Sequence, residues 1–212
     1  MTTKPPSIDE LIAGFDRSLR TLTGNTPTNR PRPGTDTAEA PLSDSEREHA
    51  AGLMRINHCG EICAQALYEG QALTAKSEQA RETLLNAAQE ETDHLNWCRE
   101  RLEELDAKPS VLDPLFYAAS WTMGALTGLA GDRISLGFVE ATEDRVVKHL
   151  DEHLTQLPEG DDRSRAILNQ MREDEAHHAE EAVAQGGQVF PEPVKNLMAL
   201  VSQVMTKTTY KI

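Results

Sequence analysis

The pattern Glu-x-x-His occurs twice in segments that are predicted to be helical, as Glu91 with His94 and as Glu175 with His178. Positions i and i+3 lie on one face of an α-helix, so each pair can present a carboxylate and an imidazole to the same ion. Oxygen and imidazole donors together suit iron or manganese. The spacing therefore indicates a metal site, provided that facing helices supply further ligands.

Two predicted helical hairpins bring one more glutamate level with each pair. In the first hairpin, Glu61 and Glu91 lie at equal separations from a bend at Lys76, one before it and one after it. The second hairpin repeats this arrangement, because Glu143 and Glu175 are equally far from Glu159 in the bend PEGDD. Each residue of an α-helix advances the chain by about 1.5 Å, so antiparallel packing places the two members of each hairpin side by side.

Charge balance favours two cations at this level. A buried, unpaired carboxylate costs several kcal/mol, and neighbouring carboxylates disfavour one another's ionisation. Two divalent ions would balance four glutamates, with neutral histidines completing the ligand set. The alternative is that these glutamates lie on solvated faces with ordinary ion pairs. The predicted metal ligands, which are also the predicted catalytic residues, are Glu61, Glu91, His94, Glu143, Glu175 and His178.

Other polar residues near these motifs have weaker patterns. Glu90 precedes His94 by four residues and Asp174 precedes His178 by four, so both either orient the imidazoles or are exposed acidic residues. A third pair, Glu46 with His49, has no counterpart at its level. We expect this third pair to cap an exposed helix start.

The elements that must position the ligands are all helices. Strand-like alternation is absent, and apolar residues recur at helical spacing, so we expect an all-α fold built as a helix bundle. We expect residues 1–45 to form a short amphipathic helix and a flexible linker rich in Pro, Thr, Asn and Gly, and residues 46–212 to form the metal-binding domain. The expected helices span about 7–22, 43–75, 77–106, 115–130, 132–157, 162–185 and 191 onward.

Composition excludes several classes of protein. The net charge of −14 and the lack of a basic patch argue against binding of nucleic acid. Cys59, Cys63 and Cys98 are too few and too irregular for a disulfide framework, which favours reduced thiols in the cytoplasm. The start of the chain has no basic region followed by an apolar core, so we do not expect secretion.

Five segments resemble the demethoxyubiquinone hydroxylase family of ubiquinone biosynthesis. The resemblance covers about residues 54–210, with Asp144 beside Glu143 where relatives commonly have a second glutamate. The segments are NHCGE (57–61), EETDH (90–94), PLFYAASWTMGALTGLAG (114–131), FVEATEDRVVKH (138–149) and REDEAHH (172–178). The resemblance implies a ferritin-like four-helix bundle with additional apolar and C-terminal helices.

The family's chemistry is di-iron monooxygenation. The resemblance implies that two iron ions, O2 and an external electron donor derived from NAD(P)H hydroxylate a ring carbon of a polyprenylated methoxy-benzoquinol. It also implies that Glu61 and His94 hold one iron, that Glu143 and His178 hold the other, and that a bridging pair, Glu91 with Glu175, contacts both. An iron-oxidising or iron-storing ferritin-like protein is the alternative function, and a non-catalytic scaffold is a third.

The substrate of this family is insoluble, which points to the membrane surface as a partner. Residues 114–131 form an uncharged run whose length is at the lower limit for spanning a bilayer. This run either spans the membrane, or dips one face into the lipid surface, or is buried in the core. We expect peripheral association with the cytoplasmic face of the inner membrane, aided by Lys207 and Lys211. Other ubiquinone-biosynthesis proteins and further copies of this chain are additional possible partners.

Overall fold

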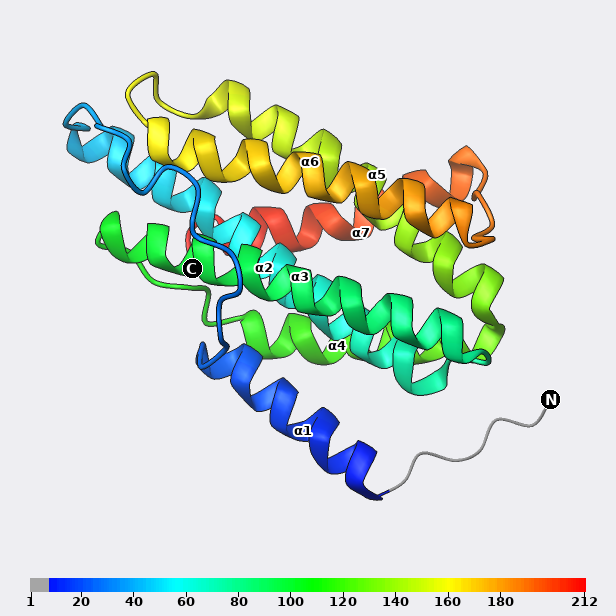
Figure 1. The fold of residues 1–212 in the computed structure, drawn as a ribbon. Helices are drawn as coiled ribbons and strands as arrows, with labels where there is room; N and C mark the ends of the chain where they lie inside the picture. The colour runs from blue at the N-terminus through cyan, green and yellow to red at the C-terminus, as the bar shows by residue number, and fades with distance from the viewer. Residues whose placement is uncertain (1–7) are drawn as a thin grey trace.

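A computed structural model describes residues 8–212, and this part of the chain is helical without strands (Figure 1). The predicted all-α fold is confirmed, and the helix ends lie close to the expected ones. Residues 1–7 of the expected N-terminal segment lie outside the described part. The helices are α1 (Ile8–Thr23), α2 (Asp44–Thr74), α3 (Glu78–Glu104), α4 (Asp113–Ala130), α5 (Asp132–Gln156), α6 (Asp162–Ala184) and α7 (Glu192–Thr209).

Two helical hairpins, α2–α3 and α5–α6, form the four-helix bundle. Short polar side chains begin the helices of these hairpins: the Ser77 hydroxyl accepts from the Ala80 N–H at the start of α3, and Asp161 accepts from the Ser164 N–H at the start of α6. At the exposed start of α2, Ser43 and Glu46 form a reciprocal capping box. The expected capping role is therefore confirmed for Glu46 but wrong for His49, whose ring nitrogens lie 2.7 Å from the Tyr210 hydroxyl and 3.0 Å from the carbonyl oxygen of Gln156.

Of three buried apolar clusters, one joins Ile62, Leu95 and Tyr117 between α2, α3 and α4, and the other two lie toward opposite ends of the bundle. One of these end clusters joins residues such as Leu53, Trp97 and Leu168, and the other joins Tyr68, Leu84 and other side chains near the α2–α3 bend. Burial of each large apolar side chain stabilises the fold by about 1.5–3 kcal/mol. The predicted ligand positions fall between the two end clusters, so apolar side chains cover their level from both ends of the bundle.

The apolar helix α4 packs closely along α2. A Cβ atom added at Gly124 would lie 2.1 Å from the carbonyl oxygen of Leu67, and one added at Gly70 would lie 2.2 Å from that of Trp121. The GxxxG spacing of α4 thus serves contact with α2 of the same chain. The outer face of α4 exposes Leu115 and Leu129, among others. Among residues 8–212, no helix combines the length and apolar composition needed to cross a bilayer.

Residues 24–42, which we call the strap, connect α1 to α2 and run across the bundle beside α3 (Figure 1). The composition of this segment predicted a flexible linker, and that prediction took no account of its arginines. Arg30 and Arg32 make ion pairs with carboxylates of α3, and Arg30 also pairs with one of α6. A domain boundary at residue 45 stays a prediction.

Candidate metal centre

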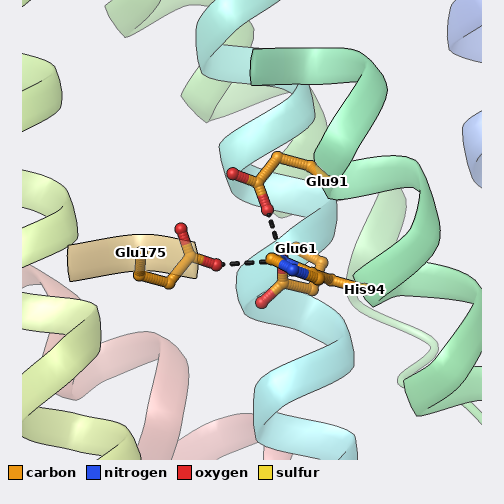
Figure 2. Close-up of side chains that lie close together, drawn as sticks. All are labelled: Glu61, Glu91, His94 and Glu175. Carbon is orange, nitrogen blue, oxygen red and sulfur yellow. Dashed lines mark hydrogen bonds and ion pairs between the residues drawn. The ribbon is translucent and has the colours of Figure 1, made fainter. Parts of the chain in front are cut away.

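The structure brings four of the six predicted ligands into one compact group. Glu61 from α2, Glu91 and His94 from α3 and Glu175 from α6 have ligand atoms that all lie within 4.8 Å of one another (Figure 2). Each of these residues is at most 3 % exposed. His94 Nδ1 lies 2.9 Å from Glu91 Oε2 and 3.0 Å from Glu175 Oε1, so its Nδ1 edge faces the carboxylates.

The other two predicted ligands lie beside this group. His178 Nδ1 is 3.2 Å from Glu91 Oε1 and 3.1 Å from Glu175 Oε2, and Glu143 accepts a hydrogen bond from the Tyr68 hydroxyl. Both Glu143 and His178 are buried. Because Glu91 and Glu175 each contact both imidazoles, these two glutamates lie between the two halves of the group. All six predicted residues are thus gathered in one buried place.

Outer carboxylates contact the far edge of each imidazole, and they come from the opposite helix. Asp174 Oδ2 of α6 lies 2.8 Å from His94 Nε2, and Glu90 Oε2 of α3 lies 2.8 Å from His178 Nε2. With Nδ1 facing the carboxylate group, Nε2 carries a proton and donates to the outer carboxylate. The two orienting residues were anticipated, but the pairing of Glu90 with His94 and Asp174 with His178 was wrong.

The antiparallel course of α3 and α6 explains this exchange. Contacts between the helices advance along one as they retreat along the other, so Asp174 lies level with His94 and Glu90 lies level with His178. A residue one turn earlier on the same helix is instead displaced by about 6 Å along the axis.

Protons balance the charges of this group when no cation does. Burial, followed by the charges of Glu91 and Glu175, raises the pKa of Glu61 and of Glu143 well above the usual range. Burial would also raise the pKa of Glu91, but hydrogen bonds with the two histidines hold it well below that range. Four close carboxylates disfavour one another's ionisation in a buried site, so Glu61 and Glu143 hold their protons to higher pH than an ordinary carboxyl group does.

The two histidines hold further protons. Burial would lower the pKa of His94, but hydrogen bonds with Asp174 and Glu175 raise it well above its usual value. Burial acts in the same direction on His178, and hydrogen bonds with Glu175 and Glu91 raise its pKa to about 12. The shifts at two carboxyl groups and two imidazoles of the group therefore all favour the protonated form when no cation is bound.

The donor set fits a pair of divalent cations. Glu61 Oε2 is buried and accepts no hydrogen bond, although an unsatisfied buried acceptor is costly. This oxygen lies 3.6 Å from His94 Nδ1 and so faces the group, and four carboxylates with two imidazoles are the ligands that carboxylate di-iron bundles use. The geometry is therefore compatible with two metal ions, and the role of each residue as a ligand stays a prediction.

The remaining polar residues near the ligand motifs have other partners. Asp144 pairs with Lys148 and Lys195 at the surface, so it does not contact the ligand group. His58 pairs with Asp113 on the α4 side. Tyr68 was missed in the sequence, although it lies two helical turns after Glu61 and hence on the same face of α2.

A cleft of about 410 Å³ lies apart from this group and is lined by residues of α1, α2, α3 and α4. Its polar end holds Glu69, which accepts hydrogen bonds from the hydroxyls of Tyr117 and Ser18. Tyr68, one position earlier on α2, points to the metal-ligand group instead. The carboxylate–imidazole group, and not this cleft, holds the residues suited to metal chemistry.

Comparison with known proteins agrees with this geometry. Residues 48–209 match the family described as ubiquinone biosynthesis protein COQ7. Proteins called 3-demethoxyubiquinol 3-hydroxylase from Stutzerimonas stutzeri and Chromohalobacter salexigens are each 58 % identical over 205 residues, covering 96 % of this chain and 95 % and 96 % of those proteins. One of the same name from Xanthomonas campestris is 52 % identical over the full length of both chains. The chain therefore belongs to the COQ7 family of ubiquinone biosynthesis proteins.

Proposed function

We propose that this protein is a 3-demethoxyubiquinol 3-hydroxylase, a di-iron monooxygenase that adds a hydroxyl group to the ring of its quinol substrate in ubiquinone biosynthesis. The observation that carries this proposal is the buried group of four glutamates and two histidines in a chain that is 58 % identical to hydroxylases of that name. Ferritin-like iron oxidation needs similar ligands, and the relatives' names favour the hydroxylase.

The six residues of this group can be assigned as ligands of two iron ions. Glu61 and His94 would hold one ion and Glu143 and His178 the other, while Glu91 and Glu175, which contact both imidazoles, would bridge the pair. When bound, two ferrous ions supply the electrons with which O2 is activated for hydroxylation. Further electrons come from an external donor, which we propose is derived from NAD(P)H.

The side chains of the protein prepare the site for that chemistry. Asp174 and Glu90 accept the Nε2 protons of the two histidines, which fixes each imidazole with Nδ1 toward the centre. Tyr68 donates to Glu143 and thereby limits the rotation of this carboxylate. The apolar clusters at both ends of the bundle keep bulk water away from the ligands.

We place the protein at the cytoplasmic face of the inner membrane, attached peripherally. Support comes from three helices that expose apolar side chains: Phe15 on α1 is 65 % exposed, Leu129 on α4 is 59 % exposed and Val201 on α7 is 64 % exposed. Such faces suit the surface at which a polyprenylated quinol is found. Other biosynthetic proteins and a second copy of this chain are further partners that these faces could accept.

The experiment that tests this function is anaerobic loading with ferrous iron, followed by addition of O2, a reductant and a short-chain demethoxyubiquinol analogue. We expect a product heavier by one oxygen atom, detected by mass spectrometry. Glu91→Ala and Glu175→Ala should abolish the product, because each removes a ligand shared by both ions. Glu46→Ala is the matched control, since its Glu-x-x-His lies at the exposed start of α2. Iron oxidation without a hydroxylated product would favour the ferritin-like function.

A further inference from the structure

A row of mostly polar side chains on α3 lies beside the face that carries Glu91 and His94, and it faces the strap. The spacing of its members repeats every three or four residues, so they share one face of the helix. The members are Asp93, Asn96, Trp97, Glu100, Arg101 and Glu104. Each contacts the strap: for example, Asn96 Oδ1 accepts from Thr26 Oγ1, and Trp97 Nε1 donates to the carbonyl oxygen of Arg30. The strap therefore belongs to the wall of the bundle at the level of the metal site.

Arg30 is the strap residue that reaches the ligand group. Its Nε lies 3.2 Å from Asp93 Oδ2 and its Nη1 lies 2.8 Å from Asp174 Oδ2, so the guanidinium joins a carboxylate of α3 to one of α6. It also lies over the ring of Trp97, with 4.9 Å between Cζ and the ring centroid. The planar fork of Arg suits two carboxylates at once, which a lysine ammonium does not match.

Arg30 acts on the imidazole through Asp174. Its Nη2 is 3.2 Å from His94 Nε2, but both nitrogens are donors when Nδ1 is a metal ligand, so they cannot form a hydrogen bond. Asp174 Oδ2 instead accepts from both His94 Nε2 and Arg30 Nη1. Arg30 thus holds Asp174 Oδ2 in place, and this oxygen in turn orients the imidazole of His94.

The two halves of the site differ in this support. Asp174 has a side chain that is 16 % exposed and is held by Arg30 from the strap. Glu90, which has the same role toward His178, has a side chain that is 53 % exposed and lies on the surface. The imidazole of His94 therefore has an orienting carboxylate that is itself fixed and shielded, whereas that of His178 has a solvated one.

We propose that Arg30 is a positioning residue for the half of the metal centre that contains His94, and that the strap makes the two iron positions unequal. This inference rests on the proposed di-iron function. The ion beside His94 is bound more tightly because Arg30 holds Asp174 in place. Removal of outer partners of this kind typically weakens metal binding by about 10–100-fold.

The test is an equilibrium titration of chelator-treated full-length protein with Co2+, followed by visible absorption and by the shifted imidazole N–H resonances of the bound metal. Arg30→Gln should weaken the binding of one of the two Co2+ ions by about 10–100-fold. The same variant should shift or remove the His94 N–H resonance and leave that of His178 unchanged. Arg30→Lys should be intermediate. Arg32→Gln is the matched control, because Arg32 binds the strap to Glu100 and Glu104 of α3 without touching Asp93 or Asp174.

A second variant separates positioning from folding. Arg30→Gln leaves Asp93 buried with one ion-pair partner fewer, so the double variant Arg30→Gln/Asp93→Asn removes that charge and should still show the loss at one ion. Unchanged binding of both ions in Arg30→Gln would overturn the inference. If Arg30→Gln and Arg32→Gln both weakened the binding of the two ions equally, the strap would have a purely structural role, and this result would also overturn the inference. A wild-type protein that binds fewer than two ions contradicts the proposed function instead.

Discussion

Loading two divalent cations into the metal-free protein at pH 7 should release about four protons. The groups expected to carry these protons are Glu61 and Glu143, whose pKa values lie well above the usual range, and the two histidines. The pKa of His94 is raised well above its usual value and that of His178 is raised to about 12. Metal ligands must be deprotonated, so each of these groups loses one proton when it binds. Four released protons balance two divalent ions, and the net charge of the buried group stays unchanged.

The same count sets the pH dependence of metal affinity. Each ion replaces about two protons, so its apparent dissociation constant should fall about a hundredfold for each unit by which the pH is raised near neutrality. Because the pKa values of these groups are raised, lower pH favours the protonated, metal-free form of the protein over the metal-bound form.

The assay is calorimetric titration with Co2+ in two buffers that differ in their enthalpy of ionisation, because the difference in heat gives the number of protons released. Glu61→Gln should release about three protons in excess metal, because the amide holds no acidic proton. Glu46→Gln, at the exposed cap of α2, should release about four. Release of two protons or fewer from the wild type would show that the carboxylates are ionised without metal, and the charge argument would be refuted.

Two further predictions concern stability. Gly124→Ala should lower the free energy of unfolding by about 1–3 kcal/mol, because its Cβ would clash with α2. Gly60→Ala, whose Cβ would have no atom within 4 Å, should raise the free energy of unfolding by about 0.5–1 kcal/mol. Urea unfolding of both variants measures these changes, and equal effects would contradict the close packing of α4 on α2. Burial lowers the pKa of His153 from 6.5 to about 3. The unfolded chain therefore binds a proton that the folded chain does not between these values, and stability falls as pH drops through that window. From pH 7 to pH 5 this loss is about 2 kcal/mol. His153→Gln should remove that part of the pH dependence, and an unchanged slope would disprove its origin in this residue.

Much of the fold follows from the sequence because its determinants are periodic. The helix ends coincide with capping serines and aspartates, and the apolar stripes interrupted by glutamates are buried as expected, with Leu84, Leu95 and Leu102 at most 1 % exposed. Distance along a helix is fixed by its rise per residue, so equal separations from a bend sufficed to place Glu61 beside Glu91 and Glu143 near Glu175.

The contacts that could not be predicted depend on rotation and on long side chains. Which helix supplies the partner of a histidine is set by how α3 and α6 are rotated toward each other, and the spacing within one helix does not contain that information. Arg30 lies in a segment without periodicity, so its contacts with Asp93 and Asp174 left no pattern there. The row of mostly polar side chains on α3 was the available sign that another segment covers this face.

The proposed ligands of each iron come from both hairpins. Glu61 and His94 belong to the α2–α3 hairpin, but the group that surrounds His94 is complete only with Glu175 from α6. The hydrogen bonds of the two imidazoles cross between the hairpins in the same way, as does Arg30 from the strap. Neither hairpin alone therefore offers a full ligand set for either ion. A pair of cations at this level links the two hairpins, and the site exists only in the assembled bundle.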